Sequence, residues 1–197
     1  MKLVFATGNE GKLKEVSKLF YDYNVEVISP IQLGKMPDII EDGATFEANA
    51  KIKAEEIFKM YGVPTIADDS GLEVEQLNNE PGVYSARYAG EGCSYDDNNK
   101  KILAELEKYS APHSARFVCC AVYYDGKNYA VNNGYLVGEI INEFKGKNGF
   151  GYDPIFKPAG YDKTLAELAL TEKNSISHRG KAFTALRKSL IEKGLIK

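Results

Sequence analysis

Residues 2–20 read KLVFATGNEGKLKEVSKLF, and this stretch decides the fold class. Its apolar start, Lys2–Ala6, predicts a strand that ends at the turn formers Thr7-Gly8-Asn9. Apolar side chains then recur at helical spacing, at Leu13, Val16, Leu19 and Phe20. Val25–Ile28 predicts a second strand. A strand, a loop, a helix and a strand in this order favour an α/β fold.

The length and composition indicate a globular protein of one domain or of two closely joined lobes. A chain of 197 residues suits one domain, and 44% hydrophobic with 27% charged residues excludes disordered and fibrous classes. The net charge of −3 argues against binding to nucleic-acid polymers or anionic membranes. No apolar run approaches the roughly 20 residues of a membrane helix, so we expect a soluble, cytoplasmic protein. Cys119 and Cys120 are adjacent in a predicted strand, where they face opposite sides, and we expect reduced thiols.

The middle of the chain predicts a helix followed by a strand. Thr45 is a suitable N-cap, and Gly62-Val63-Pro64 ends the helix. Thr65–Ala67 then predicts a buried strand that ends at Asp68-Asp69-Ser70-Gly71, and the alternation of Leu72, Val74 and Leu77 predicts a further strand.

The second half predicts a hairpin and further helices. Residues 116–124 and 129–139 form the hairpin, with its turn at Asp125-Gly126. Residues 145–164 read as a long loop, 165–170 as a short helix and 177–191 as the last helix. We treat residues 1–197 as a single domain and expect a second lobe, if there is one, at about 75–135.

The first loop is a candidate phosphate site. Residues Thr7, Gly8, Asn9, Glu10, Gly11 and Lys12 lie between a strand and a helix, and a helix N-terminus attracts phosphate. Glycines allow close backbone approach, and Lys12 adds a positive charge. The loop does not fit the Walker A pattern. By itself it is equally compatible with a plain strand-to-helix connection that carries a helix cap.

Acidic residues offer a metal site and a general base. Asp68 and Asp69 follow a buried strand, where two carboxylates are costly without a compensating cation. Magnesium prefers such oxygen ligands, and a carboxylate can deprotonate an attacking water. The alternative is an Asp-rich turn. Glu41 could share the metal if the fold brings it beside Asp69. Lys53 and Asn49 lie four residues apart on one helix face, and Lys53 could reach a phosphate or be an ordinary exposed lysine.

Two later segments are candidates for recognising a base. In Phe150-Gly151-Tyr152-Asp153, aromatic rings flank a glycine, which suits either stacking on a base or a tight turn that fills the core. His178 and Arg179 would occupy the first turn of the last helix, after Ser177 as N-cap. Cations are unfavourable there, so we expect them to face an anion or a carbonyl-bearing ligand.

Five stretches together resemble the inosine triphosphate pyrophosphatase family. They occur in the family's order and span nearly the whole chain: ATGNEGKLKEV, EDGATFEANAKIKAEEI, IADDSGLEVEQLNNEPGVYSARYAGE, NGFGYDPIF and EKNSISHRGKA. The resemblance implies hydrolysis of ITP, dITP and XTP to the monophosphate and pyrophosphate, with Mg²⁺ as cofactor and a cytoplasmic homodimer. It also implies an elongated, mixed α/β sheet flanked by helices, with two lobes and an active-site cleft between them.

The resemblance also implies a role for each candidate residue. Asp69 would be the catalytic proton acceptor and, with Glu41, a metal ligand, while Asp68 would assist the metal. The remaining residues would bind substrate: Thr7 to Lys12, Lys53, Ser70, Phe150, Gly151, Tyr152, Asp153, Lys173, His178 and Arg179. Two other classes stay open. One is the related Maf-like group of nucleotide pyrophosphatases, against which the segments around Phe150 and His178 argue. The other is a module that binds nucleotides without hydrolysing them.

Overall fold

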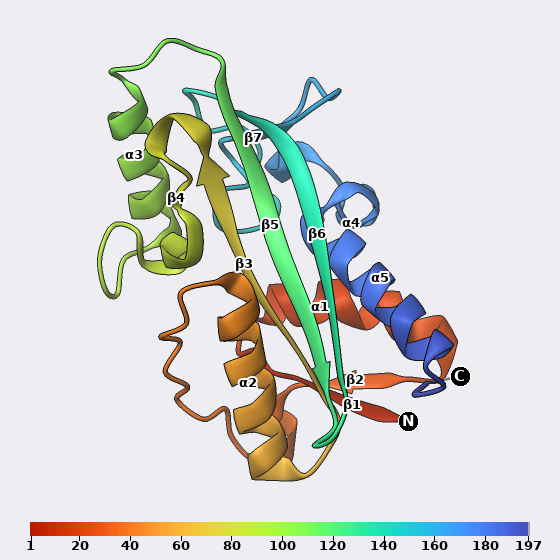
Figure 1. Ribbon diagram of the computed structural model, residues 1–197. Coiled ribbons are helices and arrows are strands. Elements are labelled where there is room, and N and C mark those ends of the chain that lie inside the picture. Colours follow the sequence, from red (N-terminus) through yellow and green to blue (C-terminus); the bar gives the residue numbers. More distant parts are fainter. Residues whose placement is uncertain (197) are drawn as a thin grey trace. The chain divides into compact units, whose positions relative to one another are not determined.

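The computed structural model describes residues 1–196 and is a mixed α/β structure (Figure 1). Its strands are β1 Lys2–Phe5, β2 Glu26–Ile28, β3 Thr65–Val74, β4 Glu80–Pro81, β5 His113–Tyr124, β6 Tyr129–Ile140 and β7 Phe156–Pro158. Its α-helices are α1 Glu10–Phe20, α2 Phe46–Tyr61, α3 Tyr95–Leu106, α4 Leu170–Ile176 and α5 His178–Glu192. Short 3₁₀ helices are η1 Tyr21–Tyr23, η2 Pro30–Leu33, η3 Glu75–Leu77, η4 Gly82–Arg87 and η5 Leu165–Glu167.

The described strands form one mixed sheet in the order β2-β1-β3-β5-β6-β7, with β4 paired to β3. The predicted α/β class with a mixed sheet and flanking helices is therefore confirmed. The chain divides into two compact units. Unit 1 comprises Met1–Asp69, Cys119–Gly134 and His178–Lys197, and unit 2 comprises Ser70–Val118 and Tyr135–Ser177.

Unit 1 has a core on each face of its strands. Strand β1 lies between β2 and β3 and is parallel to both, with Val4 opposite Ile28 and Thr65. On one face, apolar side chains of β1 and β3 pack with α1 and α5, and on the other they pack with α2. Cys119 belongs to the first core and Cys120 to the second, which confirms that they face opposite sides.

Helix α2 begins and ends where the sequence predicts. The Thr45 hydroxyl accepts a hydrogen bond from the amide of Ala48, and Gly62 ends the helix in the left-handed conformation at φ 63°. A cap of this kind satisfies an amide that the first helical turn leaves without a partner. The phase of the helix is thereby fixed, which sets the direction of Asn49 and Lys53.

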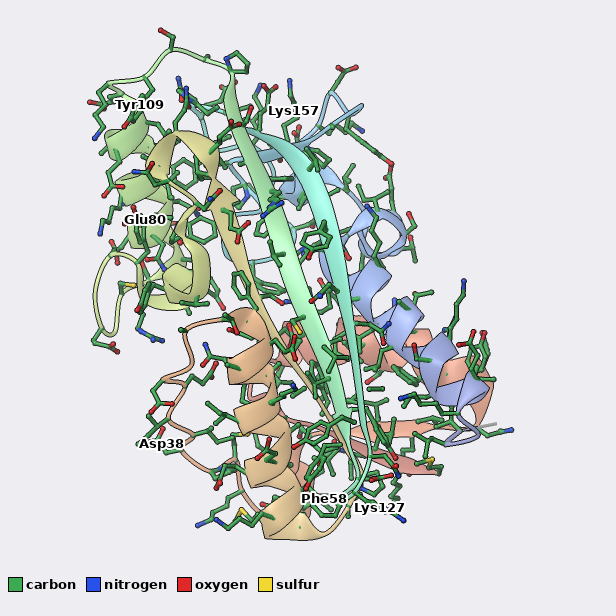
Figure 2. All side chains as sticks on the ribbon, viewed as in Figure 1. Asp38, Phe58, Glu80, Tyr109, Lys127 and Lys157 are labelled. Atoms are coloured by element: carbon green, nitrogen blue, oxygen red, sulfur yellow. The ribbon has the colours of Figure 1, made fainter. Side chains whose placement is uncertain are left out.

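The predicted hairpin is also confirmed. Its turn carries Gly126 at φ 89°, and the Asp125 carboxylate accepts hydrogen bonds from the amides of Lys127 and Asn128. Figure 2 shows Phe58 of α2 near the turn that bears Lys127. A Cβ at Gly126 would lie 2.5 Å from the Phe58 ring, so the close approach requires glycine.

Unit 2 has its own core. Strand β4 is antiparallel to β3, and β7 is antiparallel to β6. Ile102 and Leu106 of α3 pack into this core with Phe117 and Phe156, whose ring centroids lie 4.7 Å apart.

Three sequence predictions about the elements were wrong. The strand predicted at Thr65–Ala67 and the further strand predicted from Leu72 are a single strand, β3, because Asp68–Gly71 between them keep the extended backbone. The predicted helix 165–170 is the 3₁₀ turn η5, and a separate helix, α4, follows it. The predicted loop 145–164 contains β7. Within residues 1–196, no helix is both long and apolar enough to cross a membrane.

Candidate active site

The first loop is shorter than predicted and is held by its own side chains. Asn9 is the N-cap of α1, and its Oδ1 accepts the amide of Lys12 at 3.1 Å. The hydroxyl of Thr7 accepts the amide of Asn9 at 3.1 Å. Glu10 and Gly11 therefore already belong to the first helical turn. The helix-cap interpretation is confirmed, while phosphate binding by the same turn stays a prediction.

Asp68 lies at the centre of a buried charge network. Both of its carboxylate oxygens lie within 3.2 Å of the Lys12 ammonium, and Oδ2 accepts Arg179 Nε at 3.3 Å. Arg179 Nη1 donates to Glu15 at 2.8 Å. The side chains of Asp68, Glu15 and Arg179 are each at most 4% exposed. Charges of alternating sign thus run from Glu15 through Arg179 and Asp68 to Lys12.

The two cations of this network, Lys12 and Arg179, are buried in a setting that disfavours their charged forms. Burial lowers the pKa of Lys12, and the opposing effect of Asp68 does not restore it. Burial also acts against the charged form of Arg179, but Asp68 and Glu15 together raise its pKa above the ordinary value. Arg179 in the first turn of α5 was expected to face an anion or a carbonyl-bearing ligand, and it faces two carboxylates of the protein.

Asp69 has a separate set of partners on α2 and the preceding loop. Asn49 Nδ2 donates to Asp69 Oδ2 at 3.1 Å, and Lys53 Nζ lies 3.5 Å from Asp69 Oδ1. The same ammonium donates to Glu41 Oε2 at 2.6 Å. Glu41 is therefore brought to Asp69, as the metal hypothesis required, and Lys53 is a buried ion-pair partner rather than an exposed lysine.

The pKa shifts follow from this arrangement. Burial raises the pKa of Asp69, although Lys53 and Asn49 favour its ionised form. Burial acts to lower the pKa of Lys53, but Asp69 and Glu41 outweigh it, and the net shift is upward. Asp69 is thus a buried acid that is held next to a permanently charged ammonium.

The predicted magnesium ligands are Glu41, Asp69 and Asp68. Within the described residues 1–196, no three His, Cys, Asp or Glu side chains lie close enough to form a complete metal site. Magnesium, however, is commonly held by one or two carboxylates plus substrate phosphates. Glu41 and Asp69 fit that requirement because their oxygens converge on one cationic nitrogen. Asp68 fits less well, since both of its oxygens contact Lys12.

Unit 2 contains a second cluster, at the predicted aromatic loop. The carboxylate of Asp153 accepts the amide of Phe150 at 2.8 Å and the Lys173 ammonium at 2.7 Å. Lys173 also lies over the Phe150 ring, 4.7 Å from its centroid. Tyr152 is a buried core residue whose hydroxyl donates to the Ser85 carbonyl at 2.8 Å. The Phe150 ring lies at 6.2 Å from that of Tyr95 and is partly exposed, so this loop both fills the core and presents a ring.

The remaining predicted residues, Ser70 and His178, lie on β3 and α5. Ser70 follows Asp69 in β3 and is the first residue of unit 2, while the buried His178 begins α5 in unit 1. The sequence reasoning missed two residues as parts of the site, Glu15 and Asn49. Asn49 could have been found from its spacing to Lys53, whereas nothing in the local sequence distinguishes Glu15 from an exposed acid of α1.

Known proteins of one family resemble this chain over nearly its whole length. A model described as the Ham1 family matches residues 3–189. A dITP/XTP pyrophosphatase of Elusimicrobium minutum is 47% identical over 198 residues, covering 96% of this chain and 100% of that protein. One of Oceanobacillus iheyensis is 46% identical over 192 residues, covering 96% of this chain and 98% of that protein.

Solved structures agree with the sequence comparison. A Ham1 protein from Coxiella burnetii superposes with a TM-score of 0.89 at 41% identity, covering 98% of this chain and 99% of that chain. A Staphylococcus aureus Ham1 protein gives a TM-score of 0.87 at 41% identity, covering 98% of this chain and 100% of that chain.

Proposed function

This chain belongs to the Ham1 family, and we propose that it hydrolyses ITP, dITP and XTP to the nucleoside monophosphate and pyrophosphate. Such an enzyme removes unusual purine nucleotides from the nucleotide pool. The observation that carries the proposal is the group formed by Glu41, Lys53 and Asp69. It combines a buried carboxylate, a cation and a second carboxylate within 3.5 Å of the ammonium nitrogen.

In the proposed reaction, Asp69 orients a water molecule and accepts its proton. The water oxygen forms a bond to the α-phosphorus, the bond from that phosphorus to its bridging oxygen breaks, and pyrophosphate leaves. Lys53 and Lys12 stabilise the charge on the leaving group, and the amides of the α1 N-terminus favour phosphate oxygens. The raised pKa of Asp69 suits it to accept a proton.

We propose that Glu41 and Asp69 hold Mg²⁺. Asp68 assists indirectly, because it binds the ammonium of Lys12. The bound ion would supply positive charge for the phosphate oxygens. Lys53 is the ammonium in contact with both carboxylates, and a triphosphate would add further negative charge to this group.

Recognition of the base is proposed for the residues that remain. Phe150 offers a ring for stacking, and Gly151, Tyr152, Asp153 and Lys173 shape the loop around it. Ser70, His178 and Arg179 complete the proposed contacts to sugar and base. A site built for a 6-oxo purine disfavours adenine, because its donors would be left without partners. We also propose that the enzyme is a cytoplasmic homodimer.

A pyrophosphate-release assay tests the function. Purified protein is incubated with ITP, dITP, XTP and the normal nucleotides, with Mg²⁺ and with EDTA. We expect release from the first three in the presence of Mg²⁺ alone. A preference for other modified nucleotides would favour a Maf-like activity, and binding without release would favour a non-hydrolytic module. Either result would overturn the proposal.

A further inference from the structure

Asn49 bridges the loop of Glu41 to the carboxylate of Asp69. Its Oδ1 accepts the amide of Gly43 at 2.8 Å, and its Nδ2 donates to Asp69 Oδ2 at 3.1 Å. The side chain is buried, at 2% exposure. Both ends of the amide are therefore used within unit 1, away from solvent.

The orientation of this amide is determined by its partners. A backbone amide can only donate, so Gly43 must meet the oxygen of Asn49 and not its nitrogen. The nitrogen then faces Asp69, and it is satisfied there by an acceptor oxygen of that carboxyl group. Asn49 thus donates to one defined oxygen of Asp69.

Asn49 also determines how the Asp69 carboxylate is turned. The terminal torsion of an aspartate is soft and permits rotation of the two oxygens. Asn49 donates to Oδ2 of Asp69, while Oδ1 of the same carboxylate faces the Lys53 ammonium. With one oxygen fixed, the other is directed towards the ammonium that also holds Glu41.

Gly43 completes the arrangement from the loop side. A Cβ on Gly43 would lie 2.6 Å from Asn49 Oδ1 and 2.8 Å from the Ala48 Cβ. The loop can approach the first turn of α2 this closely because residue 43 has no side chain. Asn49 therefore couples the position of the Glu41 loop to that of Asp69.

We propose that Asn49 is the positioning residue of the catalytic carboxylate and of the metal-binding pair. The proposal rests on the proposed function, since it assigns Asn49 a role in that same site. Groups that orient metal ligands and catalytic carboxylates typically change metal affinity or activity about 10–100-fold when they are removed. Asn49 is expected to act in that range while making no contact with substrate itself.

The test compares Asn49→Ala and Asn49→Asp with the wild-type protein. Asn49→Asp keeps the shape and can still accept the Gly43 amide, but in its ionised form it repels Asp69 instead of donating to it. We expect kcat for ITP to fall about 10–100-fold in both variants, with KM changed by less than about threefold. Binding of Mn²⁺ in the absence of nucleotide, measured by calorimetry, should weaken over the same range in Asn49→Ala; in Asn49→Asp the added carboxylate can itself bind the ion, so kcat is the readout for that variant.

A matched control is available in the same unit. Asn128 Nδ2 donates to Asp125 Oδ2 at 3.0 Å, which is the same type of contact at the hairpin turn. Asn128→Ala should leave kcat and Mn²⁺ binding unchanged. If Asn49→Ala folds poorly, kcat of Asn49→Asp decides the question, because that variant keeps the shape of the side chain.

A double-mutant comparison separates positioning from a general loss of stability. In metal-free buffer, the melting-temperature shift of Asn49→Ala with Asp69→Ala should differ from the sum of the two single shifts, because the residues are in contact. Wild-type kcat in Asn49→Asp, wild-type Mn²⁺ binding in Asn49→Ala, or additive shifts would overturn the positioning role. Failure of the wild-type protein to release pyrophosphate would instead overturn the proposed function.

Discussion

Replacing Glu15 by Gln should destabilise the protein strongly, although Glu15 is not one of the proposed substrate-binding residues. Glu15 and Arg179 are 2.8 Å apart, with side chains at most 4% exposed. The variant leaves Arg179 and Lys12 to share the single carboxylate of Asp68. A network of two acids and two bases would become one with an excess buried positive charge.

The magnitude follows from the burial of this pair. Removing one partner of a buried ion pair costs about 3–5 kcal/mol, since the other charge stays desolvated. Domains have unfolding free energies of about 5–15 kcal/mol, so the loss is a large fraction of the total. Urea m-values are about 1–3 kcal/mol/M, and a chain of this length lies towards the upper end, so the urea midpoint should fall by roughly 1–2 M.

Equilibrium unfolding in urea, followed by circular dichroism, measures this loss. Glu26→Gln is the matched control, because Glu26 pairs with Lys2 at 3.8 Å on the surface, where the side chains are 61% and 62% exposed. The control should change the unfolding free energy by less than about 1 kcal/mol. Added salt should leave the difference between the two variants nearly unchanged, since buried pairs are poorly screened. A Glu15→Gln midpoint equal to that of Glu26→Gln would refute the reasoning.

Four other predictions concern single residues. Asp69→Asn should nearly abolish pyrophosphate release while circular dichroism remains unchanged, and retained turnover would exclude Asp69 as the proton acceptor. The pKa of Asp69 is raised above 3.8 by burial, so in metal-free buffer its ionisation should cost stability as pH rises through that pKa. Asp69→Asn should therefore gain stability relative to wild type as pH rises above 3.8 in urea unfolding, and a constant difference would contradict the shift. Native alkylation followed by mass spectrometry should modify Cys93 alone, because the other two thiols are buried and burial raises the pKa of Cys120 to about 12; label on either buried thiol would count against this. Gly149→Ala should lower the melting temperature and weaken ITP binding, because φ is 77° and the new Cβ would lie 2.0 Å from Asp153 Oδ2; an unchanged KM would be the contrary outcome.

The elements that the sequence predicted are those with strong local signals. The N-cap Thr45, the terminating Gly62 and the Asp125-Gly126 turn each act through their nearest neighbours, and each boundary was predicted correctly. Strand β3 was predicted as two strands with a break between them, because Asp68 and Asp69 have low strand propensity. Their partners lie far away in the chain and compensate for that preference.

The candidate site was predictable in its members and less so in its contacts. Asp69, Lys53 and Glu41 were identified together, and they lie together. The link between Glu15 and Arg179 spans 164 positions in the sequence. No periodicity or local motif encodes such a contact, because it depends on how α1 and α5 pack against the same strands.

Neighbouring positions in β3 place Asp68 and Asp69 on opposite faces of the strand. Asp68 is hydrogen-bonded by groups of α1 and α5, whereas Asp69 is hydrogen-bonded from α2. The two carboxylates therefore lie on opposite faces of the sheet and are hydrogen-bonded by different helices. Substitutions in α2 can change the hydrogen bonds of Asp69 and leave those of Asp68 in place, and substitutions in α1 or α5 can do the reverse. The two groups still act on each other through charge, because Lys12 acts to lower the pKa of Asp69 and Asp68 acts to raise that of Lys53.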